Sequence, residues 1–163
     1  MKPRRSILSV PGHVEKMHQK ARLSPADVIM LDLEDSVPLD AKETARETVV
    51  RSILSLDWQD KIVTTRINGL ETPFGYLDLL SLAERAGQRL DCVVVPKVDH
   101  IGDIHFVDRL LNGIEMNTKP TNRIGIEASI ESAQGLERVS EIAGASSRLE
   151  TLVFGVADFS SSI

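Results

Sequence analysis

Short apolar runs alternate with longer amphipathic stretches along this chain of 163 residues, and this alternation constrains its fold more than any other feature. Each run is rich in aliphatic or β-branched residues and short enough to be a strand. Most runs are apolar on both faces, as parallel strands covered by crossover helices are. The six predicted strands are residues 6–10, 28–33, 62–67, 92–95, 124–128 and 151–154.

The segments between these runs have helical spacing and predict five crossovers. Asp40, followed three residues later by Glu43, predicts the start of the second helix. Gly87 and Gly113 follow helical stretches and predict left-handed helix ends. The predicted helices are residues 13–23, 40–56, 72 or 74 to 86, 101–112 and 132–143.

Six βα units with right-handed crossovers are compatible with an open doubly wound sheet or with most of a closed barrel. We predict an α/β fold of the (β/α)8 TIM-barrel type, with residues 1–163 forming a single domain. Because an eight-unit barrel usually needs about 250 residues, we expect a chain truncated after about six units. Strand edges and core surface would then need a partner to cover them.

Composition excludes several classes of function. The formal net charge of −5 is spread along the chain, so no basic stripe for nucleic acid is present. The apolar stretch behind the first basic residues is short, which argues against a signal peptide or a membrane span. The single cysteine, Cys92, lies in an apolar run and is expected to be buried and unpaired. We therefore expect a cytoplasmic protein without disulfides.

Polar residues gather where the predicted strands end. In order along the chain they include the acidic pair Glu34 and Asp35, then Arg66, Lys97 and the stretch from Glu127 to Glu131, and finally Asp158. Ligands of barrels and of open α/β sheets bind at the carboxyl ends of the strands. This convergence predicts a site for an anionic, oxygen-rich ligand together with a hard cation.

Glu131 and Asp158 follow consecutive predicted strands and are the candidate metal ligands. Both supply hard oxygen donors, and neither position offers a His or Cys ligand for zinc. Mg²⁺, or alternatively Mn²⁺, held by two carboxylates, ligand oxygens and water fits this pair. The competing interpretation is structural: Glu131 would cap the helix that begins at Ser132, and Asp158 would begin another turn.

Arg66 ends an otherwise apolar strand, and its guanidinium is suited to bind a carboxylate or an enolate through two parallel hydrogen bonds. The alternative is a structural ion pair with Glu34 or Asp35. For this acidic pair we favour a supporting role, in which it holds Arg66 and other cations or reaches the metal through water.

Lys97 and the histidines are weaker candidates. Lys97 could attract a phosphate or form a Schiff base, but an ordinary salt bridge to Asp99 is the simpler interpretation. His13 and His18 are five residues apart, which does not place them on one helical face. We expect His13 to be a surface residue.

The motifs taken together resemble the citrate lyase β-subunit and malyl-CoA lyase branch of the magnesium-dependent HpcH/HpaI aldolase family. The resemblance covers essentially the whole chain, and the order and spacing of the motifs make it specific. The motifs are residues 5–12 (RSILSVPG), 31–37 (LDLEDSV), 65–69 (TRING), 95–98 (VPKV), 130–135 (IESAQG) and 154–158 (FGVAD).

This resemblance implies a β/α barrel that assembles into trimers or hexamers. It also implies a Mg²⁺-dependent enzyme that cleaves or forms a carbon–carbon bond in a 3-hydroxyacyl thioester, carried by CoA or an acyl carrier, with release of a 2-oxo acid. No nucleic-acid or membrane partner is implied.

The resemblance also assigns roles to single residues. Glu131 and Asp158 match the metal ligands, and Glu34 and Asp35 match an acidic pair that, with Arg66, we assign to catalysis. The substrate-binding set that the resemblance implies is Arg66, Lys16, Ala157 and Asp158. Ser9 departs from the aromatic residue common at its position in the family.

Members of that family continue for roughly another hundred residues, through the last barrel strands and a C-terminal lid. In several members a neighbouring subunit's lid supplies an acidic catalytic group, so proton transfer is the step that this chain would lack. Two alternatives therefore stay open. One is a non-catalytic binding or assembly subunit that keeps the metal site, and the other is an aldolase acting on free 2-oxo acids.

Overall fold

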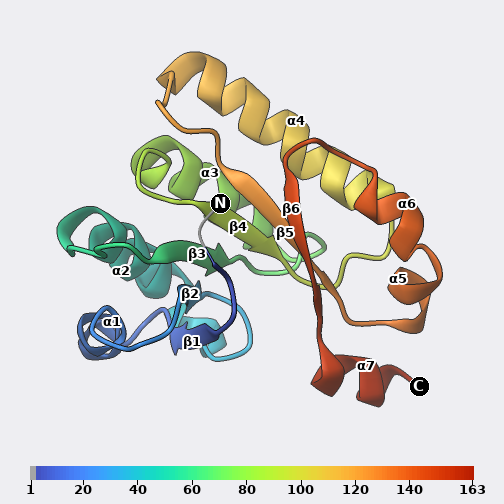
Figure 1. Ribbon diagram of the computed structural model, residues 1–163, viewed down its shortest axis with the longest axis horizontal. Coiled ribbons are helices and arrows are strands. Elements are labelled where there is room, and N and C mark those ends of the chain that lie inside the picture. Colours follow the sequence, from blue (N-terminus) through green and yellow to red (C-terminus); the bar gives the residue numbers. More distant parts are fainter. Residues whose placement is uncertain (1–2) are drawn as a thin grey trace.

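All six strands of the sheet run parallel, and each lies beside its neighbour in the sequence (Figure 1). A computed structural model describes residues 3–163. Because the strand order is β1-β2-β3-β4-β5-β6, each crossover moves in the same direction, whereas a doubly wound sheet reverses at a switch point. The barrel-type prediction is confirmed. The strands are β1 (Ile7–Pro11), β2 (Val28–Asp32), β3 (Ile62–Arg66), β4 (Cys92–Val95), β5 (Gly125–Ile130) and β6 (Leu149–Phe154).

Helices connect successive strands, and α1 to α4 follow one another along one side of the sheet (Figure 1). The predicted fifth helix is two short helices, α5 and α6, that meet at Arg138. In the part of the chain that the structure describes, no helix is long and apolar enough to cross a bilayer. The helices are α1 (Glu15–Ala21), η1 (Leu39–Ala41), α2 (Lys42–Ser55), α3 (Gly75–Ala86), α4 (Ile101–Thr118), α5 (Ala133–Glu137), α6 (Val139–Ala143) and α7 (Val156–Ser162).

The two faces of the sheet differ in chemistry. On the face toward the helices, alternate strand residues such as Leu31 and Val93 join the hydrophobic core. The residues between them belong to the opposite face, which is unusually polar and carries Asp32, Arg66 and Glu127. Buried charged groups require partners of opposite charge. Asp32 pairs with Arg66, and Glu127 pairs with Arg4, which precedes β1.

Arg4 shows that the sheet is curved. In a flat sheet, β1 and β6 would lie about 24 Å apart, five strand spacings. Arg4, which precedes β1, nevertheless forms ion pairs with Glu127 of β5 and Glu150 of β6. The sheet therefore curls around its polar face, as the wall of a barrel does.

Two predicted helix boundaries were wrong, and a third lies where it was predicted but with a different backbone conformation. Helix α2 begins after the 3-10 turn η1, and Asp40 does not cap it. Helix α4 continues through Gly113, and its left-handed end is Lys119 instead (φ 50°). Helix α3 ends at Ala86, as predicted, but Gly87 after it has a right-handed rather than a left-handed backbone. Packing of each helix on the sheet decides these ends more strongly than the local signals do.

Candidate functional site

Arg66 is the centre of an ion-pair network at the carboxyl ends of the strands. Its Nε and Nη2 donate to the two oxygens of Asp32 at 2.7 and 2.8 Å. Its Nη1 lies 3.1 Å from Glu34 Oε2 and 3.2 Å from Asp35 Oδ2. The guanidinium is mostly buried, and the three carboxylates raise its pKa against the effect of burial. It is therefore a fixed cation.

Asp32 is the residue that sequence reasoning missed. It is fully buried and, besides Arg66, accepts hydrogen bonds from the backbone N–H of Glu34 (2.9 Å) and Ser36 (3.1 Å). Burial favours the neutral acid, but hydrogen bonds from Arg66 and Ser36 outweigh it and lower the pKa of Asp32. The available signal was a carboxylate inside the apolar run 28–33, which needs a buried partner.

Glu34 links this network to Lys97, which follows β4. Its Oε1 accepts a hydrogen bond of 2.9 Å from Lys97 Nζ, whereas its buried Oε2 has no hydrogen-bond partner among residues 3–163. Burial raises the pKa of Glu34 despite the nearby cations. The Lys42 ammonium stabilises the loop after β2 by donating to the carbonyl oxygens of Leu33 (2.8 Å) and Glu34 (2.7 Å).

Glu131 follows β5 and is buried. Its Oε2 accepts a hydrogen bond of 3.1 Å from the backbone N–H of Lys97, and within the described chain its Oε1 accepts none. Burial, followed by the negative charge of Asp158, raises the pKa of Glu131. The interpretation of Glu131 as a helix cap is wrong, because the Ser132 side chain caps α5 through Gly135 N–H (3.0 Å).

Asp158 lies in the first turn of α7. The helix begins directly after β6, and a ring contact between Phe154 and Phe159 joins the two elements, with centroids 5.0 Å apart. The charge of Asp158 acts on both Glu131 and Lys97, raising the pKa of each. The expectation that it begins a helical turn is confirmed, and from that position its charge acts on Glu131.

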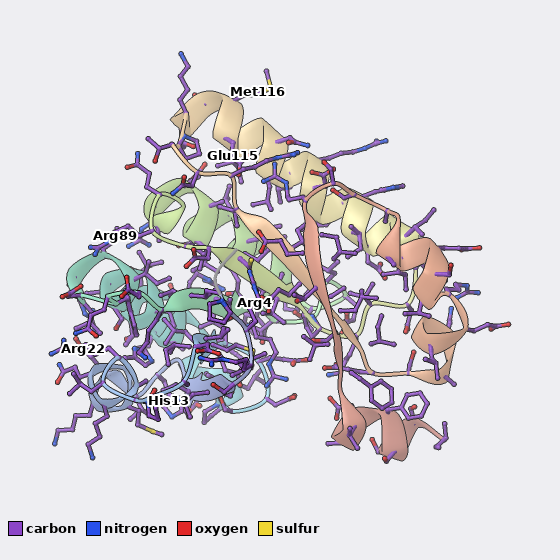
Figure 2. The ribbon with its side chains drawn as sticks, viewed as in Figure 1. Arg4, His13, Arg22, Arg89, Glu115 and Met116 are labelled. Atoms are coloured by element: carbon purple, nitrogen blue, oxygen red, sulfur yellow. The ribbon has the colours of Figure 1, made fainter. Side chains whose placement is uncertain are left out.

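The remaining predicted residues lie at the margin. Lys16 is exposed on α1, and no hydrogen bond or ion pair within residues 3–163 joins it to the network. Ala157 is exposed on α7 beside Asp158. His13 is exposed, as expected, near the start of α1 (Figure 2). His18 is instead buried, bonded to Ser52 Oγ (2.8 Å).

The predicted salt bridge between Lys97 and Asp99 does not form. Lys97 pairs with Glu34, 2.9 Å away, and Asp99 accepts a hydrogen bond from Ser132 Oγ. The hydrogen bond to Glu34 raises the pKa of the Lys97 ammonium. Lys97 therefore stays charged at neutral pH, which disfavours the Schiff-base chemistry that requires a neutral amine.

The donor set fits a hard divalent cation. Glu131 has a carboxylate oxygen that accepts no hydrogen bond from residues 3–163, and the charge of a second carboxylate, Asp158, raises its pKa. No group of three or more His, Cys, Asp and Glu side chains suited to a metal occurs in residues 3–163. Two carboxylates completed by ligand oxygens and water are typical of Mg²⁺ rather than of zinc.

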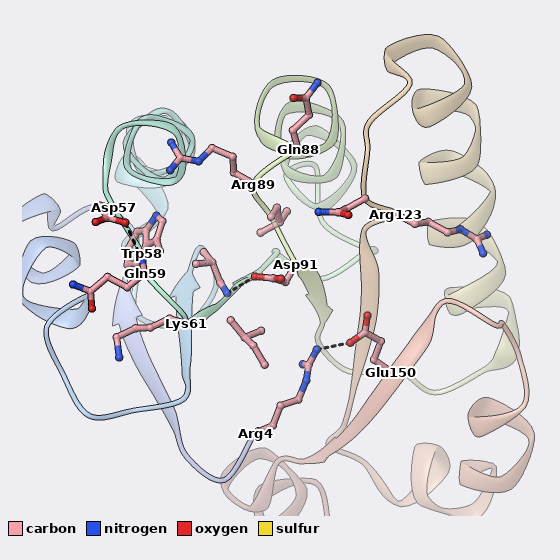
Figure 3. Close-up of a pocket in the computed structure, with 14 residues that line it drawn as sticks. Arg4, Asp57, Trp58, Gln59, Lys61, Gln88, Arg89, Asp91, Arg123 and Glu150 are labelled. Carbon is pink, nitrogen blue, oxygen red and sulfur yellow. Dashed lines mark hydrogen bonds and ion pairs between the residues drawn. The ribbon is translucent and has the colours of Figure 1, made fainter. Parts of the chain in front are cut away.

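Two cavities lie at opposite ends of the strands. A pocket of about 290 Å³ lies at the carboxyl ends, and its lining includes Glu34, Asp35 and Lys97, although Glu131 and Asp158 are not part of it. A larger cavity of about 590 Å³ lies at the amino ends and is shown in Figure 3. Its arginines are occupied by structural contacts, such as Arg4 with Glu150. We therefore place the chemistry at the carboxyl ends.

Comparison with known proteins agrees with this geometry. The model of the family described as HpcH/HpaI aldolase/citrate lyase matches residues 5–163. The chain belongs to this family. The match begins before β1 and extends through α7, so it includes every residue of the network described above.

The chain is similar to relatives whose names state different substrates. An L-malyl-CoA/beta-methylmalyl-CoA lyase of Cereibacter sphaeroides is 44% identical over 99% of this chain and 51% of its own length. A citrate lyase subunit beta of Leuconostoc mesenteroides is 34% identical over 96% of this chain and 51% of its own length. The chain thus spans about half the length of the curated relatives that it matches.

A solved structure provides the corresponding fold with ligands. The protein CitE from Mycobacterium tuberculosis, in complex with magnesium, acetoacetate and coenzyme A, matches this family member with a TM-score of 0.75 and 26% identity. The match covers 98% of this chain and 52% of that one.

Proposed function

We propose that this chain carries the metal and substrate-carboxylate site of a carbon–carbon lyase that cleaves a 3-hydroxyacyl thioester, such as malyl-CoA or citryl-CoA. The products would be an acetyl thioester and a 2-oxo acid. One observation carries the proposal: Glu34, Arg66, Lys97 and Glu131 form a continuous network across β2 to β5. Relatives in the same family are named as lyases of malyl-CoA and citrate.

Glu131 and Asp158 would hold Mg²⁺ or Mn²⁺, and the M. tuberculosis relative with bound magnesium supports the choice of Mg²⁺. The bound cation would act as a Lewis acid on the carbonyl of the 2-oxo acid. Burial and the charge of Asp158 raise the pKa of Glu131, because they make its negative charge unfavourable. A bound cation would neutralise that charge, so the same two causes suit Glu131 to be a metal ligand.

Arg66 would offset negative charge that grows on the substrate carboxylate or the enolate during bond cleavage. Asp32 already occupies Nε and Nη2, so Nη1, beside Glu34 and Asp35, is the part of the guanidinium that faces the site. The two acidic residues keep this group in place, and substrate would compete with the exposed Asp35 for it. Lys16 and Ala157 would contact substrate only at the margin of the site.

Whole-protein properties stay proposals of the same kind. We infer a homo-oligomer, for which the family resemblance implies a trimer or hexamer. Exposed apolar side chains on β6 and α7, among them Phe154 and Val156, support the inference that this surface is covered by another chain. Coenzyme A is supported as the thioester carrier by the M. tuberculosis complex, and an acyl carrier is the alternative. The cytoplasmic location rests on Cys92, a buried free thiol.

The test is to mix the protein with Mg²⁺ and malyl-CoA or citryl-CoA and to measure the acetyl-CoA released. Glu131→Ala should abolish turnover. Glu137→Ala is the matched control, because Glu137 is exposed at the end of α5, the helix that follows Glu131, and its loss should leave turnover unchanged.

The competing function is a non-catalytic metal-binding or assembly subunit. Metal binding that depends on Glu131, without acetyl-CoA release from either thioester, would favour this second function. Release of pyruvate or glyoxylate from free 2-oxo acid aldols would instead indicate an aldolase that does not use thioesters.

A further inference from the structure

The chain makes an irregular turn directly after β4. Val95 pairs with Ala128 in the β4–β5 register, and the next contact joins Val98 N–H to Ser129 O at 3.0 Å. From Val95 to Val98 the chain advances by three residues, while its contacts on β5 advance by one residue, from Ala128 to Ser129. Pro96 and Lys97 lie within this step. This arrangement is a bulge, and bulges at the ends of barrel strands redirect groups next to active sites.

Lys97 takes a left-handed backbone conformation within this bulge, with φ of 51°. Among residues 3–163, two other non-glycine residues have positive φ. Lys119 ends helix α4, and Gln59 lies in the loop before β3, so both occupy ordinary turn positions. Lysine does not favour this conformation, and such residues persist where the surroundings require them, often at functional sites.

The consequence of the turn is the direction of one N–H group. Lys97 N–H donates to Glu131 Oε2 at 3.1 Å, while Pro96 has no N–H to offer. On its other side, Glu131 packs against Gly155, where an added Cβ would overlap Glu131 Cγ and lie 2.8 Å from Oε1. The carboxylate is thus held between two backbone segments, and no donor in the part of the chain that the structure describes reaches Oε1.

The side chain of Lys97 has a different partner. Its ammonium lies 2.9 Å from Glu34 Oε1 and forms no hydrogen bond with Glu131. Lys97 therefore contacts Glu131, the proposed metal ligand, through its backbone N–H, whereas its charged side chain pairs with Glu34. Substitutions at residue 97 can therefore test the effect of its backbone conformation separately from the effect of its charge.

We propose that the left-handed turn at Lys97 positions the Glu131 carboxylate for a divalent cation, so that Lys97 is a positioning residue that acts through its backbone. The inference rests on the metal site of the proposed function. It predicts that metal affinity follows the tolerance of residue 97 for positive φ rather than its charge.

The variants Lys97→Asn, Lys97→Gly and Lys97→Val test this inference, because all three lose the ammonium equally. Asn and Gly adopt positive φ readily, whereas the β-branched Val does not. Titration calorimetry with Mn²⁺ alone should give Asn and Gly affinities close to each other, with Val weaker by about tenfold or more, as for residues that orient metal ligands. Equal losses in all three variants, or no loss in Lys97→Val, would overturn the inference.

A second measurement needs no metal. In the unliganded protein, Glu131→Gln replaces a charged acceptor by a neutral one, which weakens the hydrogen bond from residue 97. The amide proton of Lys97 should move upfield in NMR spectra and exchange faster, while that of Val98, bonded to Ser129 O, should not change. An unchanged Lys97 amide would refute the positioning role. Absence of Mn²⁺ binding by the unaltered protein, with the amide behaving as expected, would refute only the proposed function.

Discussion

Replacing Asp32 by Asn should destabilise the protein more than any other single change of charge in the network. The Asp32 side chain is fully buried and that of Arg66 is 15% exposed. Asn would present an NH₂ group to donors that now find an oxygen, namely Arg66 Nη2, Ser36 N–H and Ser36 Oγ. The buried guanidinium would keep Glu34 and Asp35 as its remaining anionic partners.

The magnitude follows from the partners that remain. Removing one member of a buried ion pair costs about 3–5 kcal/mol. Arg66 keeps Nη1 near Glu34 and Asp35, so we expect a loss near the lower limit, about 3 kcal/mol in the free energy of unfolding. For a chain of this size, that loss lowers Tm by about 6–12 °C.

The assay is urea denaturation at neutral pH, with Asp35→Asn as the matched control. Asp35 pairs with the same guanidinium, but its side chain is 55% exposed, so its loss should cost less than about 0.5 kcal/mol. Because the folded-state pKa of Asp32 is lowered from 3.8, its stabilising contribution is present above that pH and is lost as the pH falls through the lower folded value. A loss below about 1 kcal/mol for Asp32→Asn, or equal losses for both variants, would refute the reasoning.

Two further predictions concern Gly155 and His18. Gly155→Ala should weaken Mn²⁺ binding by about tenfold, since the added Cβ overlaps the Glu131 side chain, whereas Gly102→Ala, with open space around it, should not. Equal calorimetric affinities for both variants would contradict this. Burial lowers the folded-state pKa of His18 below 6.5. As the pH falls through 6.5, the unfolded chain therefore binds a proton that the folded protein does not, and stability decreases. His18→Gln should flatten this decrease between pH 7 and 5 in denaturation curves, and an unaltered slope would exclude His18 as its source.

Element type and order were predictable because each run interacts mainly with its immediate neighbours. Residues 92–95 were predicted to the residue, and the other strands differ by one or two residues at their ends. Most residues of each strand are apolar, so a strand can be recognised from consecutive residues alone, even though one face of this sheet carries Asp32, Arg66 and Glu127. Helix ends were less predictable, as the later start of α2 and Gly113 inside α4 show, because packing on the sheet overrides a cap worth about 1 kcal/mol.

The sequence by itself determined that carboxylates, an arginine and a lysine follow the strands, and the family motifs assigned them to metal and substrate. It did not determine which carboxylate pairs with which cationic side chain. Only the tertiary structure decided that Arg66 pairs with Asp32, that Lys97 pairs with Glu34 rather than Asp99, and that a backbone N–H reaches Glu131. The physical reason is that ion pairs and bulges depend on the register and curvature of neighbouring strands, which residues far apart in the chain set together.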